Sequence, residues 1–411
     1  MTRSTATESE PKYDLVSPRF LADPHPVFRR MRAEDPVYWH PGLNAWALVR
    51  YDDVQRMLRD PRFSAEAADH YRGDLPPSME AKRKVVDRFR YSMLLFKDAP
   101  AHTRFRSLIT KAFSSKVVES LRPFVQTVVD EQIDMICHQG KLDVIEQLAV
   151  PLPMRVISRI LGIPEADFPR FKAWTEDFFA LVGASLSTPA LVERGHRGVV
   201  GLDGYLRETL EDRRKQPGDD LLSLLIHAEE QSQVLSADEI VATAALFLLA
   251  GYETTTHLIG NGLLALLEHP DQLDKLRADP ELASGAVEEF LRYNSAAFQL
   301  VRRAREQIEL DDHVIQEGEI VVGFLHAANR DPARFSDAER FEITRKDNYH
   351  VGFGYGPHIC IGAPVARLET QIAINTVLRR LPEIALASTS LEWGCNSIIR
   401  GLRALPVTFR S

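Results

Sequence analysis

The chain has 411 residues, 45% of them hydrophobic, so it can bury a large core. Its formal net charge of −8 disfavours nucleic acid as a main partner, because duplex binding requires a clustered basic surface. The most apolar run, residues 241–251, is shorter than the ~18 residues that a membrane span needs. Residues 1–12 are polar and lack the apolar core of a signal peptide, so we expect a flexible tail and no membrane anchor.

Helical periodicity dominates from the N-terminal end. A short amphipathic helix is expected within residues 17–35, a hairpin at 37–40 and 45–49, and a helix at 51–59. Residues 63–93 have weak periodicity, which predicts a long loop with room for one short helix. Further helices follow in series: 101–112, 115–139, 152–161, 164–182, 189–215, 219–230, 236–267, 271–278 and 281–293.

The C-terminal third adds a few short β-prone runs and one last helix. The loop 329–350 contains no regular pattern, and no repeat or linker interrupts the chain. The sequence therefore predicts a single domain over residues 13–411, mainly α with a minor β portion (α+β). Strands are expected at 308–310, 314–315, 320–325 and 405–409, and the last helix at 363–380.

The helix predicted over residues 236–267 has two unusual features. It begins with Ser236-Ala-Asp-Glu239, a capping-box pattern in which the two side chains satisfy each other's backbone donors. Its apolar run breaks at Ala250-Gly-Tyr-Glu-Thr-Thr255, where a glycine, an acid and threonine are all locally unfavourable. Such choices together indicate function, although a solvent-facing polar stripe is the alternative.

The three cysteines, Cys137, Cys360 and Cys395, show neither a CxxC pair nor a zinc pattern, which favours a reducing, cytoplasmic location. The segment Phe353-Gly-Tyr-Gly-Pro-His-Ile-Cys360-Ile-Gly-Ala-Pro364 crowds three glycines and two prolines around one cysteine, which predicts a tightly shaped loop. A regular helix follows, so Cys360 lies beside a helix N-terminus, where backbone N–H groups favour a thiolate. The alternative is an ordinary buried cysteine.

The segment Phe353-x-x-Gly356-x-His358-x-Cys360-x-Gly362 resembles the haem-binding signature of the cytochromes P450, and the resemblance extends over essentially the whole chain. It implies a triangular helical bundle around a b-type haem, with Cys360 as the iron ligand. It also implies that Phe353 packs near the sulfur and that His358 lies beside a haem propionate.

The break in the long helix is similar to the Ala-Gly-x-Glu/Asp-Thr motif of the same family. The small Ala250 and Gly251 would leave room for oxygen. Thr254 would hydrogen-bond the activated oxygen or its ordered water, and Glu253 would bring protons inward.

Two other residue pairs match positions that the same family uses. His102 and Arg106 share a helix face and could form an exposed patch, but the resemblance places them on the haem propionates together with Arg302; the adjacent Arg303 is left open. Glu289 and Arg292 could be a surface pair, but they resemble the Glu-x-x-Arg motif, a structural element tied to the loop around Arg340.

By the same resemblance, an apolar pocket would bind the substrate, although each of these residues could equally be ordinary core. The loop 183–189 is a plausible lid, and the turn 397–399 would close the pocket. The expected substrate contacts are Met93, Leu94, Phe96, Leu246, Ala250, Ala296, Ala297, Phe298 and Ile398.

The resemblance implies a monomeric haem-thiolate monooxygenase that uses O₂ to hydroxylate or epoxidise a terpene, steroid, fatty acid or macrolide-like metabolite. Because the fold occupies the whole chain, electrons from NAD(P)H would arrive through a separate ferredoxin reductase and ferredoxin, which a basic patch at Arg104, Lys111 and Lys116 would suit. The alternatives are a peroxygenase driven by hydrogen peroxide, a haem sensor or carrier, and a haem-free helical scaffold. The Glu253–Thr254 pair disfavours the first two of these.

Overall fold

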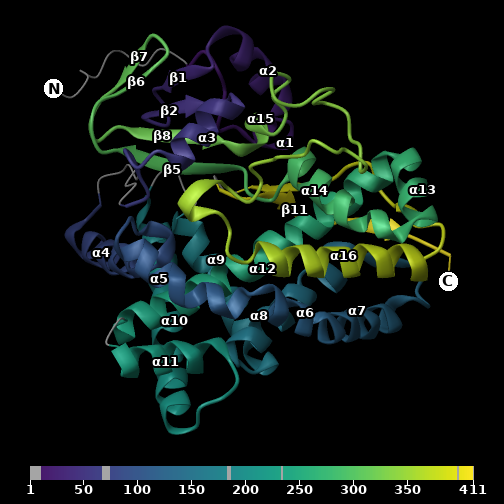
Figure 1. Ribbon diagram of the computed structural model, residues 1–411, viewed down its shortest axis with the longest axis horizontal. Helices are drawn as coiled ribbons and strands as arrows, with labels where there is room; N and C mark the ends of the chain where they lie inside the picture. Colours follow the sequence, from purple (N-terminus) through teal and green to yellow (C-terminus); the bar gives the residue numbers. More distant parts are fainter. Residues whose placement is uncertain (1–10, 67–74, 183–186, 233–234, 396–397, 411) are drawn as a thin grey trace.

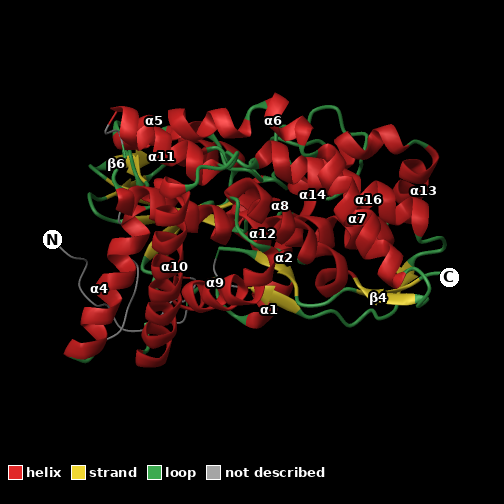
Figure 2. Cartoon of the chain, turned by 90° about the horizontal axis from the view of Figure 1, so that it is seen from below, coloured by secondary structure: helices red, strands yellow, loops and turns green. Residues whose placement is uncertain are grey.

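The computed structural model describes residues 11–66, 75–182, 187–232, 235–395 and 398–410. Figure 1 shows most of the sheet strands gathered in the upper part of the molecule, with helices filling the rest. The view from below in Figure 2 shows the same helical majority. The predicted mainly helical α+β class is confirmed.

Helix α12 (Ala237–Glu268) runs through the middle of the helical part and is buried along most of its length. Its predicted capping box is present: the backbone N–H of Glu239 donates to Ser236 Oγ at 3.2 Å, and the Ser236 N–H donates to Glu239 Oε2 at 2.9 Å. The helix ends before His269-Pro270, as the proline requires.

Helices α8, α10, α14 and α16 make extensive contacts with α12, whereas α2 and α3 pack against α15 beside the main sheet. In chain order the other helices are α1 (Pro18–Ala22), α2 (His25–Glu34), α3 (Tyr51–Arg59), α4 (Pro77–Ser92), α5 (Ala101–Ile109), α6 (Ser115–Ser120), α7 (Arg122–Ile136), α8 (Pro151–Leu161), α9 (Phe168–Val182), α10 (Pro189–Lys215), α11 (Leu221–Ser232), α13 (Pro270–Ala278), α14 (Ala283–Asn294), α15 (Leu325–Ala328) and α16 (Ala363–Arg380).

The bounds of α10 and α16 are those predicted, whereas other helices differ, most of all in two regions. The predicted helix 115–139 is divided into α6 and α7 at Leu121, just before Arg122-Pro123, because proline is tolerated only in the first turn of a helix. The expected long loop 63–93 contains α4, a helix of 16 residues. The periodic signal of α4 is weak because its apolar face is narrow. Packing against α10 stabilises the helix instead.

The main sheet has the strand order β1-β2-β8-β5-β3, with β2 and β8 parallel and the other neighbours antiparallel. Hydrophobic clusters cover both of its faces. Strand β5 was not predicted, because apolar and polar residues do not alternate regularly in its sequence Gln-Leu-Val-Arg-Arg-Ala. The strands of this sheet are β1 (Val37–His40), β2 (Ala45–Leu48), β3 (Phe63–Ser64), β5 (Gln299–Ala304) and β8 (Ile320–Phe324).

Three smaller sheets complete the β portion, and the strands predicted near 308, 314 and 405 belong to two of them. They are formed by β6 (Ile308–Leu310) with β7 (His313–Ile315), by β10 (Trp393–Cys395) with β11 (Arg400–Leu402), and by β4 (Lys141–Asp143), β12 (Pro406–Thr408) and β9 (Ala385–Leu386).

The N-terminal boundary differs slightly from the prediction. Residues 1–10 of the expected tail lie outside the described residues, as do residues 183–186 of the expected lid and Ser397. Lys12, placed at the end of that tail, forms an ion pair with Glu34 at 3.2 Å and a second one with Asp35. Lys12 is therefore attached to α2 rather than part of a free tail.

Candidate active site

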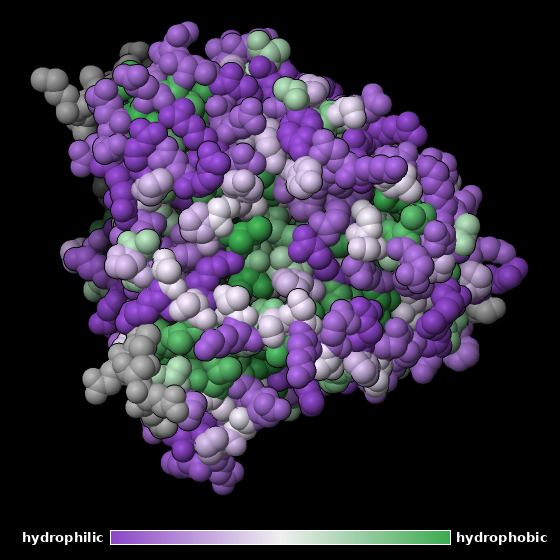
Figure 3. All heavy atoms as spheres, viewed as in Figure 1, coloured by the Kyte–Doolittle hydropathy of each residue, from purple (hydrophilic) through white to green (hydrophobic). Residues whose placement is uncertain are grey.

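An interior cavity of about 320 Å³ lies between α12, α5, α8, α9 and the loop before α16. Its walls are mostly apolar, and its polar groups come from a few positions on α5, α12, α16 and the cysteine loop. The outer surface is different: Figure 3 shows a mainly hydrophilic face, with hydrophobic residues visible in its central part. Such a cavity suits an apolar ligand oriented by a few polar contacts.

Glycines shape the loop that carries Cys360. Gly354 and Gly356 have φ of 73° and 71°, a left-handed conformation that side chains rarely adopt. A Cβ on Gly356 would also lie 2.9 Å from the carbonyl oxygen of Leu58 in α3. The loop can therefore fold against α3 only with glycine at this position.

The sulfur of Cys360 faces the cavity, which accounts for the exposed surface of a residue that the protein encloses. Burial raises the pKa of the Cys360 thiol, while the backbone N–H groups of Gly362 and Ala363 donate to the sulfur and oppose this, as does Arg106. The Cys360 N–H itself donates to the carbonyl oxygen of Phe353 at 2.9 Å. The two N–H donors at the start of α16 favour the thiolate, the form that binds metal.

Two histidines meet where α5 approaches this loop. The rings of His102 and His358 lie 4.0 Å apart between centroids, and the Nε2 atom of His102 is buried with no partner in the described structure. Arg106 donates to the carbonyl oxygen of Ile359 at 2.6 Å. Burial, followed by the charge of Arg302, lowers the pKa of His358 to about 3.

Arg302 on β5 is only 4% exposed and lies near the two histidines, and its charge lowers the pKa of both. It does not line the cavity directly. Burial also lowers the pKa of Arg302 itself, to about 10. The neighbouring Arg303 is more exposed, and Arg302 is the charge that lowers the pKa of His358 most. Together with His102 and Arg106 it makes this end of the cavity suitable for carboxylates.

Helix α12 forms the wall lined by Ala250 and Thr254. Thr254 lines the cavity, and its hydroxyl donates to the carbonyl oxygen of Ala250 at 2.7 Å. Glu253 does not line the cavity. Burial, followed by the charge of Glu176 on α9, raises the pKa of Glu253 to about 7, which suits a group that takes up and releases protons near neutral pH.

Gly251 also lines the cavity, but the structure gives it a second role. A Cβ at this position would lie 2.8 Å from Cγ1 and 3.0 Å from Cδ1 of Ile157. The glycine is therefore needed for the close packing of α8 against α12, in addition to any space that it leaves for a ligand.

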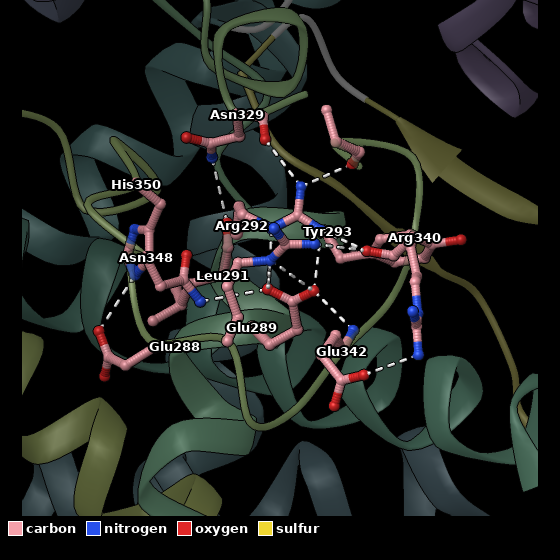
Figure 4. A network of polar contacts seen from close by, with 12 residues as sticks. Glu288, Glu289, Leu291, Arg292, Tyr293, Asn329, Arg340, Glu342, Asn348 and His350 are labelled. Atoms are coloured by element: carbon pink, nitrogen blue, oxygen red, sulfur yellow. Dashed lines mark hydrogen bonds and ion pairs between the residues drawn. The ribbon is translucent and has the colours of Figure 1, made fainter. Parts of the chain in front are cut away.

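Glu289 and Arg292 form a buried network between α14 and the loop that follows α15 (Figure 4). Arg292 donates twice to Glu289, at 2.8 Å each, and to the carbonyl oxygens of Asn329, Ala338 and Arg340 at 3.0, 2.7 and 2.8 Å. Arg340 takes part through its backbone only, because its exposed side chain binds Glu342. The network holds the loop that leads towards Cys360.

The expected substrate contacts fall into two groups. All but one line the cavity: Met93, Leu94, Phe96, Leu246, Ala250, Ala296, Ala297 and Ile398. The prediction for Phe298 is wrong: its side chain is 1% exposed and packs against Phe20, Phe28 and Phe324 on the other side of the sheet. The change of direction follows from strand alternation, because Ala297 and Phe298 must face opposite sides.

Several lining residues were missed. Phe178, Phe179 and Val182 of α9 line the cavity, but an apolar helix face looks the same in sequence whether it meets a core or a cavity. Glu369 of α16 also lines it. That residue had a signal, because an acid at this position interrupts the apolar face shared by Val365 and Ile372.

The comparisons with known proteins agree on one family. The family described as Cytochrome P450 matches residues 72–382. Cytochrome P450 monooxygenase PikC of Streptomyces venezuelae is 40% identical, covering 100% of this chain and 97% of that protein. The 6-deoxyerythronolide B hydroxylase of Saccharopolyspora erythraea is 34% identical, covering 96% of this chain and 98% of that protein.

A solved structure, P450BioI in complex with an acyl carrier protein ligated to hexadec-9Z-enoic acid, superposes with a TM-score of 0.87. It is 35% identical and covers 95% of this chain and 100% of that one. Among the described residues, no helix is long and apolar enough to cross a membrane. The family match, together with identities of 40% and 34% over nearly the full length of both relatives, shows that this chain belongs to the cytochrome P450 family of monooxygenases.

Proposed function

We propose that the chain uses O₂ to hydroxylate or epoxidise a small-to-medium lipophilic metabolite, with electrons from a separate ferredoxin. The observation that carries the proposal is the apolar cavity with Cys360 on one wall and Ala250 and Thr254 of α12 on another. A macrolide-like substrate is the first choice among terpenes, steroids, fatty acids and macrolides, because one relative is named for hydroxylating 6-deoxyerythronolide B.

Haem is the cofactor of this family, and the residues of the cavity fit it. Cys360 offers a sulfur with two N–H donors directed at it, and Phe353 lies next to it in the loop. The unpartnered Nε2 of His102, together with Arg106 and Arg302, suits the two propionates. When bound, haem with a thiolate ligand supplies the activation of O₂.

The protein's own contribution is to deliver protons and to exclude water. Thr254 and Thr255 line the cavity from a helix whose other lining residues are apolar. Glu253 would take up a proton at the outer side of α12 and release it towards Thr254, and its raised pKa keeps both charge states accessible near pH 7. Its position behind the wall, rather than in it, suits a carrier better than a substrate contact.

The electron donor would bind near the cysteine loop, on the side of α5 and α6. All three cations of the proposed patch are exposed, and Arg104 binds Glu239 of α12 at 3.2 Å. An acidic ferredoxin, reduced by a ferredoxin reductase with NAD(P)H, would match these charges.

The decisive experiment combines spectroscopy with turnover. The reduced protein with CO should show the red-shifted Soret band of thiolate-bound haem, and Cys360→Ser should abolish that band. With ferredoxin, its reductase and NADH, a macrolide-type substrate should be oxidised at the rate of NADH consumption. The proposal is wrong if the well-folded protein lacks the band. Product formation only with hydrogen peroxide would instead identify a peroxygenase, and haem binding without any product a sensor.

A further inference from the structure

We propose that an open pocket between α2 and the loop 330–340 binds a phosphate group. This pocket shares none of its lining residues with the cavity of Cys360, so its ligand would be held apart from the haem site. The inference goes beyond the proposed monooxygenase function and does not depend on it.

The pocket has a volume of about 540 Å³ and opens to solvent. Helix α2, which lies beside α15 in Figure 1, supplies one wall, and the loop after α15 supplies the other. Four positive and two negative side chains line it, which gives a net charge of +2 in a chain whose own net charge is −8. A positive pocket on a negative protein indicates an anionic ligand. The charged lining consists of Arg29, Arg32, Arg330, Arg340, Asp337 and Glu339.

Arg32 is the cation of this lining that no carboxylate neutralises. It is half-buried, and its guanidinium donates to the carbonyl oxygen of Ala327 at 2.9 Å but forms no ion pair within the described part of the chain. Burial lowers the pKa of Arg32, and the charges of Asp331 and Glu339 oppose this only in part. A partly dehydrated cation of this kind gains free energy when an anion binds it.

The other arginines are held in place by acids that they share or that lie outside the lining. Glu339 binds Arg330 at 3.0 Å and Arg29 at 3.5 Å, so one carboxylate serves two guanidinium groups. Arg340 binds Glu342 at 3.0 Å (Figure 4), and Glu342 does not line the pocket. These contacts position the guanidinium groups and leave an excess of positive charge around the opening.

The charge of the lining favours phosphate over a carboxylate. A phosphate monoester carries a charge of about −1.5 to −2 at pH 7 and three acceptor oxygens. This charge matches the +2 of the lining, and planar guanidinium groups form paired hydrogen bonds with phosphate oxygens. A carboxylate has a single charge and two oxygens, so it would leave part of the site unmatched. The pocket also has room for the molecule that bears the phosphate group.

A bound phosphate would connect two parts of the fold. Arg32 belongs to α2, whereas Ala338 and Arg340 belong to the loop whose carbonyl oxygens accept from Arg292. Because the unfolded chain lacks the site, a ligand held between these parts stabilises the folded protein by mass action. Phosphate should therefore raise the temperature of unfolding more than chloride does at the same ionic strength.

Calorimetric titration of the holoenzyme at constant ionic strength tests the site, with glycerol 3-phosphate and inorganic phosphate as probes. Arg32→Gln should weaken binding about 10-fold or more, because a charge-assisted contact is lost. It should also remove the effect of phosphate on thermal unfolding. Glu339→Gln should instead strengthen binding about 3-fold, since it removes a negative charge and keeps an acceptor for Arg330.

Arg29 and Arg30 provide a matched pair should Arg32→Gln fold poorly. They are adjacent, and their side chains are 53% and 54% exposed, but only Arg29 lines the pocket, whereas Arg30 binds Glu34. Arg29→Gln should weaken binding about 3-fold, and Arg30→Gln by less than about 2-fold, because exposed charges at a distance are screened.

The outcomes separate the possible ligands. Tighter binding of glycerol 3-phosphate than of inorganic phosphate would identify a phosphate ester as the ligand, and equal binding the free anion; both support the site. The absence of saturable binding would overturn the proposal, as would equal losses in Arg29→Gln and Arg30→Gln. Binding that shifts the Soret band and is unchanged in Arg32→Gln would place the anion at the haem and overturn it as well.

Discussion

The Glu289–Arg292 network allows a prediction worked from its contacts. Arg292 is 1% exposed and makes five hydrogen bonds, two to the buried carboxylate of Glu289 and three to backbone carbonyl oxygens. Arg292→Ala would leave Glu289 with Arg345, at 3.3 Å, as its nearest cation, and would leave the three carbonyl groups without this donor. Breaking a buried ion pair in this way costs about 3–5 kcal/mol.

That cost is a large fraction of the ~5–15 kcal/mol by which folded domains are usually stable. We therefore expect Arg292→Ala to accumulate poorly and to unfold at a much lower urea concentration, with haem content decreasing in parallel because the network holds the loop before Cys360. Urea titration followed by circular dichroism and by the Soret band measures both effects.

Arg340 offers a control for this experiment. Its carbonyl oxygen accepts from Arg292, but its side chain is exposed and binds Glu342 at 3.0 Å. Arg340→Ala should therefore change stability by less than about 0.5 kcal/mol, since surface ion pairs contribute little. The reasoning would be refuted if Arg340→Ala were as damaging as Arg292→Ala, or if Arg292→Ala cost less than about 1 kcal/mol.

Three further predictions concern α12 and the haem contacts. The folded-state pKa of Glu253, about 7, is above its ordinary value, so the native state retains a proton that the unfolded chain releases. The wild type should thus lose stability relative to Glu253→Gln between about pH 5 and about pH 7, measured by urea titration; parallel pH profiles would contradict this. Gly251→Ala should destabilise by about 1 kcal/mol, because overpacking against Ile157 at 2.8 Å outweighs the gain in helix propensity. In an Ile157→Ala background the same change should be neutral or stabilising, and an unchanged penalty would exclude the clash as its cause. His102→Leu should release haem several-fold faster to apomyoglobin, because the Nε2 donor is lost, and an unchanged rate would remove His102 from the propionate contacts.

The sequence alone was sufficient where local chemistry decides the structure. The capping box fixes the start of α12, and Pro270 its end. The glycines and prolines around Cys360 predict a tightly shaped loop, and Gly354 and Gly356 adopt the positive φ that such a loop requires. The regular pattern after the loop gives α16 with the bounds expected. These features depend on neighbours within a few residues, so they can be read without a fold.

Tertiary contacts decided the rest. Helix α4 needs the surface of α10. Alternation places Ala297 and Phe298 on opposite sides, but only the packed structure shows that Ala297 faces the cavity and Phe298 faces Phe20 and Phe28. The reason for a glycine at position 251 lies on another helix, at Ile157. The pKa of Glu369 is raised only because the packed chain buries its carboxyl group. Burial and close approach between distant segments are properties of the packed chain, and they set the space and the proton affinities of the site.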